Sequence, residues 1–280
     1  MNTSTTNSQS HTIPTIEIYP VTAQARGAFD GGKITETKPI GFPREGSAVR
    51  RVGPLFYWAW ASSSGSAVIG MHPHEGFEIV SYVLRGQLGH KDTLGTNRTV
   101  KEGGIQVMQT ASGVSHEEHM ISDNGTDFFQ IWYEPNMRET RLKSAVYADF
   151  EAEKIPTSVD ASTGITHRRF LGSVVNDSGK SAAFALDTDG TLEAYTIPAG
   201  QSVTLSLPKG RAISAVTIRG IADWRLQAGE PGHVAVRKEF AVVKAGENNA
   251  HVTLYASGVE ELEVMLVETP LSVPYHLYQK

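Results

Sequence analysis

The chain has 280 residues, more than a typical single domain, so we expect two packed β units rather than one large one. Its net charge of −5 is spread along the chain and forms no basic segment, so direct binding of nucleic acid or of an anionic membrane is not expected. The sequence contains no cysteine, which excludes disulfides and thiolate metal sites.

The amino-terminal segment reads as a disordered tail, assigned to residues 1–15. Residues 1–10 are rich in Ser, Thr and Asn, with neither the basic start nor the apolar core of a signal peptide. No stretch approaches the roughly 20 apolar residues of a membrane span. We therefore expect a cytoplasmic protein, either a monomer or a weak dimer.

From residue 16 onward the sequence has the pattern of an all-β protein with little helix. Short runs of Val, Ile, Phe, Tyr and Thr alternate with Gly, Pro and Asn, and apolar spacing of helical period is rare. A first unit, residues 16–135, is predicted to be a small antiparallel barrel or sandwich. Its clearest predicted strands are residues 55–60, 77–84, 86–90, 104–108 and 128–133.

The same pattern returns in a second unit, residues 184–280, after a connecting segment at 136–183 that is richer in charge and proline. The second unit has no His-x-His sequence, so we expect it to bind no metal. What little helix there is should lie in the connecting segment. Predicted strands in the second unit include residues 195–197, 203–207, 212–219, 220–226 and 262–268.

Two histidine pairs in the first unit predict a metal site. Residues two apart on a strand share a face, so His72 faces with His74 and His116 faces with Glu118. Glu117 should point away from the site if the strand is regular. Glu78 keeps the parity of the first pair and is the competing carboxylate, either as a ligand or as a group that orients an imidazole.

Three imidazoles and one carboxylate suit iron(II), manganese, nickel, copper or zinc, and this ligand set does not choose among them. Octahedral iron(II) would keep two positions open. Those positions could hold water, or a bidentate enol or phenol together with dioxygen, as in non-haem iron oxygenases with His and carboxylate ligands.

Several linked motifs resemble the signature of the pirins, a family of the cupin superfamily. They span roughly residues 71–118 and lie at residues 72–78, 82–86, 90–95, 104–108 and 112–118. The resemblance implies two tandem cupin-like antiparallel β-barrels of the jelly-roll type, with the metal in the first.

The resemblance also implies a ligand set, a metal and an activity. The ligands would be His72, His74, His116 and Glu118, and the usual metal is iron. Several family members have quercetin 2,3-dioxygenase activity, which opens a flavonol ring and releases carbon monoxide. Other members are known as nuclear or transcription-linked proteins, so the family alone does not fix one function.

Three positions depart from the family pattern. Glu75 stands where a basic residue is common, Val107 where Trp is common, and Glu117 where a small residue is usual. The two glutamates add negative charge near the ligands, which would disfavour an anionic phenolate or shift the metal preference.

Further residues have two interpretations. His90 and Asp92 share a strand face, so they could bind substrate or act as a base, or they could form a structural turn pair beside Gly95. Three aromatic residues of one parity could form an apolar wall for an aromatic substrate, or they could be core. These three are Phe56, Trp58 and Trp60.

The isolated histidines are interpreted as ordinary core or surface residues. They are His11, His167, His233, His251 and His276.

Two functions follow from this sequence. The first is a metal-dependent dioxygenase that acts on quercetin or a related flavonol or enol, with Glu118, His90 and Glu78 as the candidate catalytic residues. The alternative is a non-enzymatic iron-binding regulatory or stress-response protein that binds a protein partner. The open positions of the expected metal site favour the enzyme.

Overall fold

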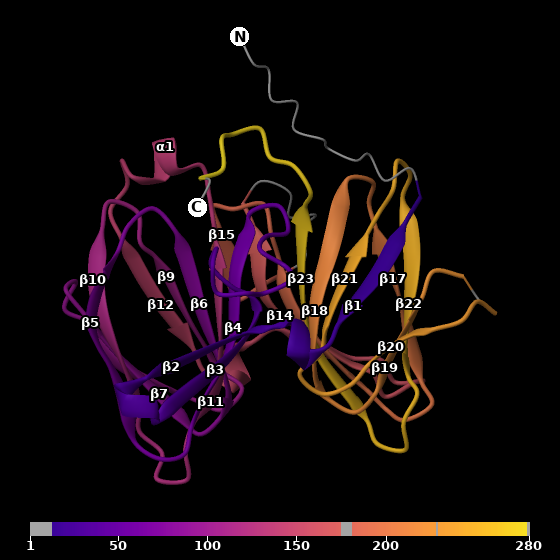
Figure 1. Cartoon of the computed structure of the whole chain (residues 1–280), viewed down its shortest axis with the longest axis horizontal. Helices are drawn as coiled ribbons and strands as arrows, with labels where there is room; N and C mark the ends of the chain where they lie inside the picture. Colours follow the sequence, from indigo (N-terminus) through magenta and orange to yellow (C-terminus); the bar gives the residue numbers. More distant parts are fainter. Residues whose placement is uncertain (1–12, 175–180, 228, 279–280) are drawn as a thin grey trace.

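The computed structural model describes residues 13–174, 181–227 and 229–278, which form two β halves side by side (Figure 1). Each half consists of a large sheet and a smaller four-stranded sheet. The large sheets lie toward the centre of the molecule and the small sheets toward its outer sides. The predicted all-β class and tandem arrangement are confirmed.

The first half contains the strands that carry the predicted metal ligands. Its four-stranded sheet has the order β5 (Ala67–His74), β10 (Val114–Met120), β7 (Gln87–Asp92) and β8 (Asn97–Lys101). Its seven-stranded sheet has the order β12 (Val146–Phe150), β9 (Ile105–Gln109), β6 (Glu78–Arg85), β11 (Asp127–Tyr133), β4 (Leu55–Ser63), β3 (Ile34–Ile40) and β2 (Ala25–Phe29).

The second half repeats this arrangement. Its large sheet has the order β1 (Thr15–Tyr19), β21 (Phe240–Lys244), β18 (Arg211–Arg219), β23 (Leu262–Pro270), β16 (Leu192–Ile197), β14 (Thr166–Ser173) and β13 (Thr157–Val159), with β15 (Phe184–Leu186) added in parallel to β14. Its small sheet has the order β17 (Ser202–Leu207), β22 (Ala250–Ala256), β19 (Ala222–Arg225) and β20 (His233–Ala235).

Helices in the described residues are short. They are α1 (Met137–Thr140) and three single 3-10 turns, η1 (Val21–Ala23), η2 (Asp30–Gly32) and η3 (Ala152–Lys154). None of the helices in the described part of the chain has the length and apolar character that crossing a bilayer requires.

The strand pairing divides the chain differently from the expected boundaries at residues 135 and 184. β1 occupies in the second half the edge position that β12 occupies in the first, and Ile16 pairs with Val243. Within the expected connecting segment, β12 belongs to the first half, whereas β13 and β14 belong to the second. The cause is that a strand pattern identifies an extended segment but not the sheet edge that it pairs with.

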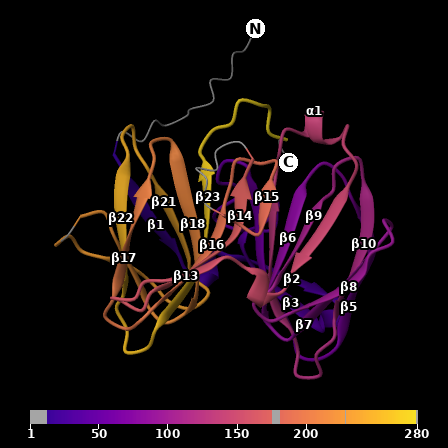
Figure 2. The same cartoon turned by 180° about the vertical axis from the view of Figure 1, so that it is seen from behind.

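A single hydrophobic cluster fills the junction between the two large sheets. Trp58 of β4 lies 5.6 Å from Phe129 of β11 and 5.8 Å from Phe240 of β21, measured between ring centroids. On the far side, where Figure 2 shows β6 and β14 near the meeting of the two halves, Tyr82 of β6 packs against Phe170 of β14 with their ring centroids 5.1 Å apart. The halves therefore share one core.

Of the two interpretations of Phe56, Trp58 and Trp60, an apolar wall for a substrate or core, the structure supports core. Trp58 and Trp60 face the second half, whose Lys238 lies 4.7 Å from the Trp60 ring. Phe56 instead packs with Tyr57 in a separate cluster of the first half. The pairing of β4 with β11 shifts register at this point, which breaks the alternation that the parity argument assumed.

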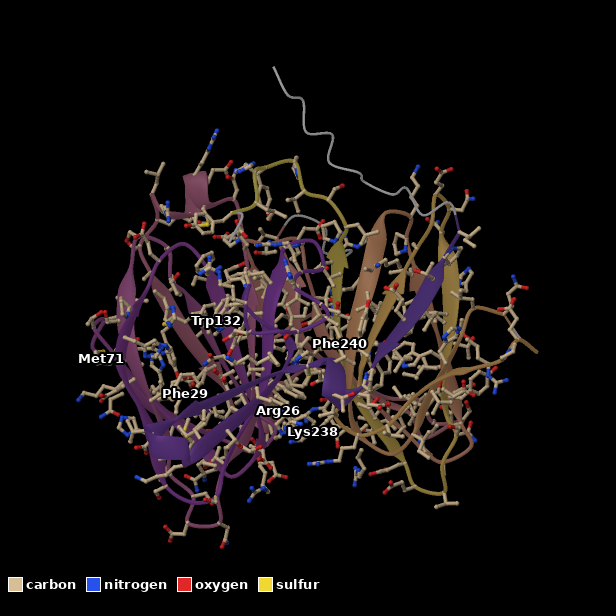
Figure 3. All side chains as sticks on the ribbon, in the orientation of Figure 1. Arg26, Phe29, Met71, Trp132, Lys238 and Phe240 are labelled. Atoms are coloured by element: carbon tan, nitrogen blue, oxygen red, sulfur yellow. The ribbon has the colours of Figure 1, made fainter. Side chains whose placement is uncertain are left out.

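Replacing Phe240 with Ala is expected to lower the free energy of unfolding by about 3–5 kcal/mol, because its ring is fully buried at the junction (Figure 3). Phe29→Ala is the control, since Phe29 is 40% exposed. It should cost under about 1 kcal/mol. Urea unfolding measures both values, and equal losses would contradict a shared core.

Candidate metal centre

Two neighbouring strands bring three histidines together. His116 of β10 pairs with His72 of β5, and Val114 pairs with His74. Burial alternates along β10, so that His116 and Glu118 face inward. One potential ligand atom from each of the three histidines lies within 4.8 Å of the others.

A local backbone feature fixes the His72 ring. The pairing of β10 with β5 shifts by one residue between His116 and Glu118, which places a bulge on β5 at Gly70 and Met71. The Nδ1 atom of His72 lies 2.8 Å from the Gly70 carbonyl oxygen. Because a carbonyl only accepts hydrogen bonds, neutral His72 carries its proton on Nδ1 and a lone pair on Nε2.

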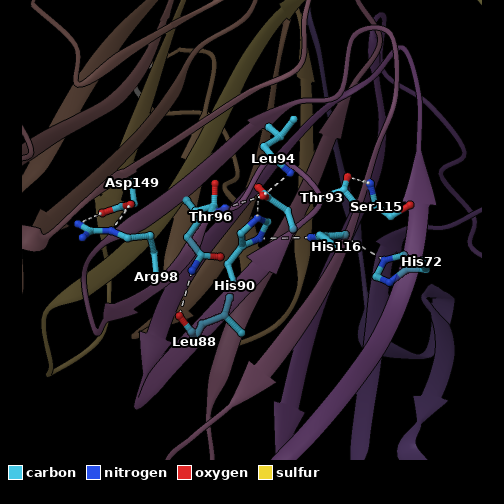
Figure 4. A network of polar contacts seen from close by, with 12 residues as sticks. His72, Leu88, His90, Thr93, Leu94, Thr96, Arg98, Ser115, His116 and Asp149 are labelled. Atoms are coloured by element: carbon cyan, nitrogen blue, oxygen red, sulfur yellow. Dashed lines mark hydrogen bonds and ion pairs between the residues drawn. The ribbon is translucent and has the colours of Figure 1, made fainter.

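A chain of contacts assigns the tautomer of His116 in the same way (Figure 4). His90 Nε2 lies 2.9 Å from the Asp92 carboxylate, so it donates there and leaves a lone pair on Nδ1. His116 Nδ1 lies 3.4 Å from that nitrogen and donates to it. His116 Nε2 therefore also carries a lone pair.

The two Nε2 atoms of His72 and His116 face each other at 3.1 Å. With both tautomers fixed, neither nitrogen has a proton for the other, and a cation between them is what relieves the contact. Two imidazoles bound to one transition metal at about 2.1 Å, about 90° apart, bring their nitrogens to about 3 Å. The donor set and its spacing therefore fit a divalent transition metal.

Burial keeps His116 neutral. Its ring is 2% exposed, and this burial lowers the pKa of His116 to about 2, with further lowering from the charges of His72, His74 and His90. A neutral imidazole is the form that binds a metal.

His74 lies against an aromatic ring that the sequence analysis did not select. The indole of Trp132, on β11, meets the His74 ring edge to face at 4.9 Å. Tyr57 packs on Trp132 at the same centroid distance of 4.9 Å. Trp132 stands in a plain apolar strand run, so only the fold reveals its contact with the site.

Glu118 is buried on the same face as His116 but is not part of the three-histidine cluster. Gln130 donates to both carboxylate oxygens, at 2.9 and 2.8 Å, and Ser81 donates at 3.3 Å. Burial raises the pKa of Glu118, while the bond from Gln130 and the charge of His72 act in the opposite direction. Gln130 and Ser81 were not anticipated, because they lie on other strands and in the other sheet.

The two extra glutamates noted in the sequence carry their charges away from the cluster. Glu117 faces outward and lies 3.4 Å from Lys91 and 3.2 Å from His119. Glu75 forms an ion pair with Arg141 at 2.9 Å. Nearby basic groups therefore partly compensate both negative charges.

Glu78 forms its hydrogen bonds with residues outside the histidine cluster, and not with an imidazole. Its carboxylate accepts hydrogen bonds from the backbone nitrogens of Asp187 and Thr188, at 2.8 and 2.9 Å, and from Gln109 at 2.8 Å. The parity argument failed here because β5 ends at His74 and Glu78 begins β6, in the other sheet. Between them Gly76 turns the chain with φ +86°. Glu78 thus ties the first half to the second.

His90 and Asp92 form the structural turn pair that was one of their two interpretations, and His90 also contacts His116 of the cluster. Asp92 holds the turn by accepting from the backbone nitrogens of Leu94 and Thr96, both at 2.9 Å. The same carboxylate orients His90, whose ring also stacks on Tyr147 at 4.3 Å. This pair therefore reaches the cluster through the His116 ring.

The second half has apolar residues at the corresponding positions. β17 and β22 correspond to β5 and β10, and the pairs Leu205–Val252 and Leu207–Ala250 stand where the first half has His72–His116 and His74–Val114. Trp224 lies opposite Leu254, as His90 lies opposite Glu118. Of the isolated histidines, His167 pairs with Glu193 at 2.9 Å, and His11 lies outside the described residues.

Comparisons with known proteins agree with this architecture. Residues 58–133 match the model of the Pirin family. A "putative quercetin 2,3-dioxygenase" of Pseudomonas aeruginosa is 30% identical over 219 residues, covering 77% of this chain and 83% of the relative. The chain belongs to the pirin family.

Solved structures share the tandem cupin fold. A bacterial pirin of Escherichia coli in complex with nickel(II) superposes with a TM-score of 0.73 at 17% identity, covering 91% of this chain and 99% of the other. A quercetin 2,3-dioxygenase of Acinetobacter baumannii gives a TM-score of 0.70 at 20% identity, covering 94% and 87%.

The metal-free protein should lose stability as the pH falls below about 6.5. The unfolded chain then binds a proton at His116, whereas the folded state, with a His116 pKa of about 2, does not. Between pH 7 and pH 5 this residue should contribute a loss of about 2 kcal/mol, which is absent in His116→Gln. Urea unfolding at both pH values measures the difference.

The control for this titration is His119→Gln, which changes an outward-facing histidine of the same strand. It should keep the pH dependence of the unaltered protein. Equal pH dependence in His116→Gln and the unaltered protein would contradict the assignment.

Proposed function

We propose that this chain is a metal-dependent dioxygenase that acts on quercetin or a related flavonol or enol. The observation that carries the proposal is the pair of Nε2 lone pairs, on His72 and His116, converging at 3.1 Å beside His74. The quercetin dioxygenase names of the Pseudomonas relative and the Acinetobacter structure support the reaction class.

His72, His74 and His116 would hold the metal, with Glu118 as the fourth ligand. Gln130 supports this role for Glu118, because it donates hydrogen bonds to both carboxylate oxygens and would orient the carboxylate. Iron(II) is the metal that we propose. The nickel(II) in the Escherichia coli pirin is consistent with a site that also accepts other divalent transition metals, namely nickel, manganese, copper or zinc. The second half, with leucine and valine at the matching positions, would bind none.

The bound metal would supply a Lewis acid and the electron transfer that dioxygen requires. The protein's own residues would orient the metal ligands and shield them from water. Asp92 and His90 hold the His116 ring in one orientation. Trp132 shields His74 from water on one side. Glu118, whose carboxylate lies on the same face of β10 as His116, is suited to accept the hydroxyl proton of an arriving enol.

His74→Ala and Glu118→Ala should each remove most of the bound iron(II), because each takes one donor from a four-ligand set. Both variants should keep the fold of the unaltered protein. Elemental analysis after anaerobic loading measures the metal, and circular dichroism measures the fold. His119→Ala is the matched control and should keep a full equivalent, since His119 faces outward. Full retention of metal by the His74→Ala, Glu118→Ala double variant would refute the site.

Anaerobic loading with iron(II), followed by quercetin in air, tests the activity. We expect loss of the flavonol absorption band together with oxygen uptake and carbon monoxide release. Glu118→Gln should slow turnover by about 100-fold or more, as expected when a group that transfers a proton is lost. If the iron-loaded protein leaves quercetin unchanged and consumes no oxygen, the substrate assignment fails.

Tight iron binding without turnover would instead favour the non-enzymatic alternative, a regulatory protein that reads the iron oxidation state. A pull-down with the iron(II) and iron(III) forms would then differ in its partners. Identical partners in both forms would count against a redox-dependent regulator.

A further inference from the structure

A large cavity lies between the first half and the segment at residues 271–278. Its volume is about 880 Å³, within the range of sites that hold drug-sized ligands. The first half contributes Phe42, Arg50, Arg51 and Phe56, and the later segment contributes Tyr275 and His276.

Specific hydrogen bonds hold the later segment in place. The Leu271 nitrogen donates to the Gly210 carbonyl oxygen at 2.8 Å. The Tyr275 hydroxyl donates to the Glu134 carbonyl oxygen at 2.8 Å, and Arg51 donates to the Tyr278 carbonyl oxygen at 3.2 Å. The cavity is therefore formed before any ligand arrives, which lowers the entropic cost of binding.

The charge of the cavity favours an anion. Arg50 and Arg51 line it together with His276, and none of the described residues that line it carries a carboxylate. Arg51 pairs with Glu134 at 2.7 Å, and that carboxylate is buried behind the arginine. Arg50 is exposed and pairs with no carboxylate of the described residues, so its guanidinium can bind a ligand carboxylate in a bidentate manner.

The aromatic lining favours a planar ligand. Phe42, Phe56 and Tyr275 all line the cavity, and Arg51 lies 5.3 Å from the centroid of the Phe56 ring. Rings and guanidinium planes stack on flat aromatic groups. A smaller cavity of about 330 Å³ in the second half differs in charge, because Glu193 and Glu268 line it.

We propose that this cavity is a second small-molecule site, which binds a planar aromatic carboxylate with Arg50 as its main anion-binding group. The site is separate from the metal centre. The ring centroids of Phe56 and Trp132 lie 6.0 Å apart and those of Trp132 and His74 4.9 Å apart, so two aromatic rings stand between the cavity and His74 of the cluster. The proposal does not depend on the proposed dioxygenase activity.

Naphthalene-2-carboxylate is the probe, and isothermal titration calorimetry with the full-length, chelator-treated protein measures its binding. We expect one saturable site per chain. Arg50→Glu should weaken binding by about tenfold or more, Arg50→Ala by less, and Arg50→Lys least. Neutral naphthalene-2-carboxamide should bind at least about tenfold more weakly than the carboxylate and should be indifferent to Arg50→Glu.

Arg138→Glu, an equivalent change at an exposed arginine of α1 outside the cavity, is the matched control and should bind the carboxylate as the unaltered protein does. The proposal is overturned if the carboxylate shows no saturable binding. It is equally overturned if the Arg50 variants bind like Arg138→Glu, or if the amide and the carboxylate bind alike. Because the measurement uses metal-free protein, a failure of the dioxygenase activity leaves its result unchanged.

Discussion

The burial of two large sheets back to back is the constraint on which the rest of this molecule depends. Trp58, Phe129 and Phe240 form a core that neither half could complete alone. With one face of each large sheet packed at the junction, only the other face is left to enclose the interior of each half together with its small sheet. That interior holds histidines in the first half and leucine, valine and tryptophan in the second.

Rigidity distinguishes the histidine cluster from a chance gathering of side chains. His72 is fixed by the carbonyl oxygen of a bulged strand, and His116 is fixed through His90 by a carboxylate that also closes a turn. The His72 and His116 rings are therefore both anchored at Nδ1, the nitrogen that faces away from the centre. Such anchoring at the outer nitrogen is how proteins set the tautomer and direction of metal-binding histidines.

Much of the fold and part of the candidate site could be predicted from the sequence. The alternation along β10 correctly turned Glu118 inward and Glu117 outward, because strand periodicity is a local property. The parity argument failed for Glu78 because the chain crosses to the other sheet before it, and for Phe56 because the strand pairing shifts register there. Gln130 and Trp132 were missed because contacts between sheets leave no periodic trace in either strand.

β1 has a consequence for how the chain assembles. Its partner strand, β21, lies more than two hundred residues later, so during synthesis β1 emerges long before the strand that it pairs with. Until the two pair, this edge of β21 has no neighbour in its own sheet, and an unpaired edge invites pairing with other chains. The first strand of the described residues thus completes the large sheet of the second half. Alterations within β1 would therefore affect the second half, which lies on the opposite side of the molecule from the histidine cluster (Figure 1).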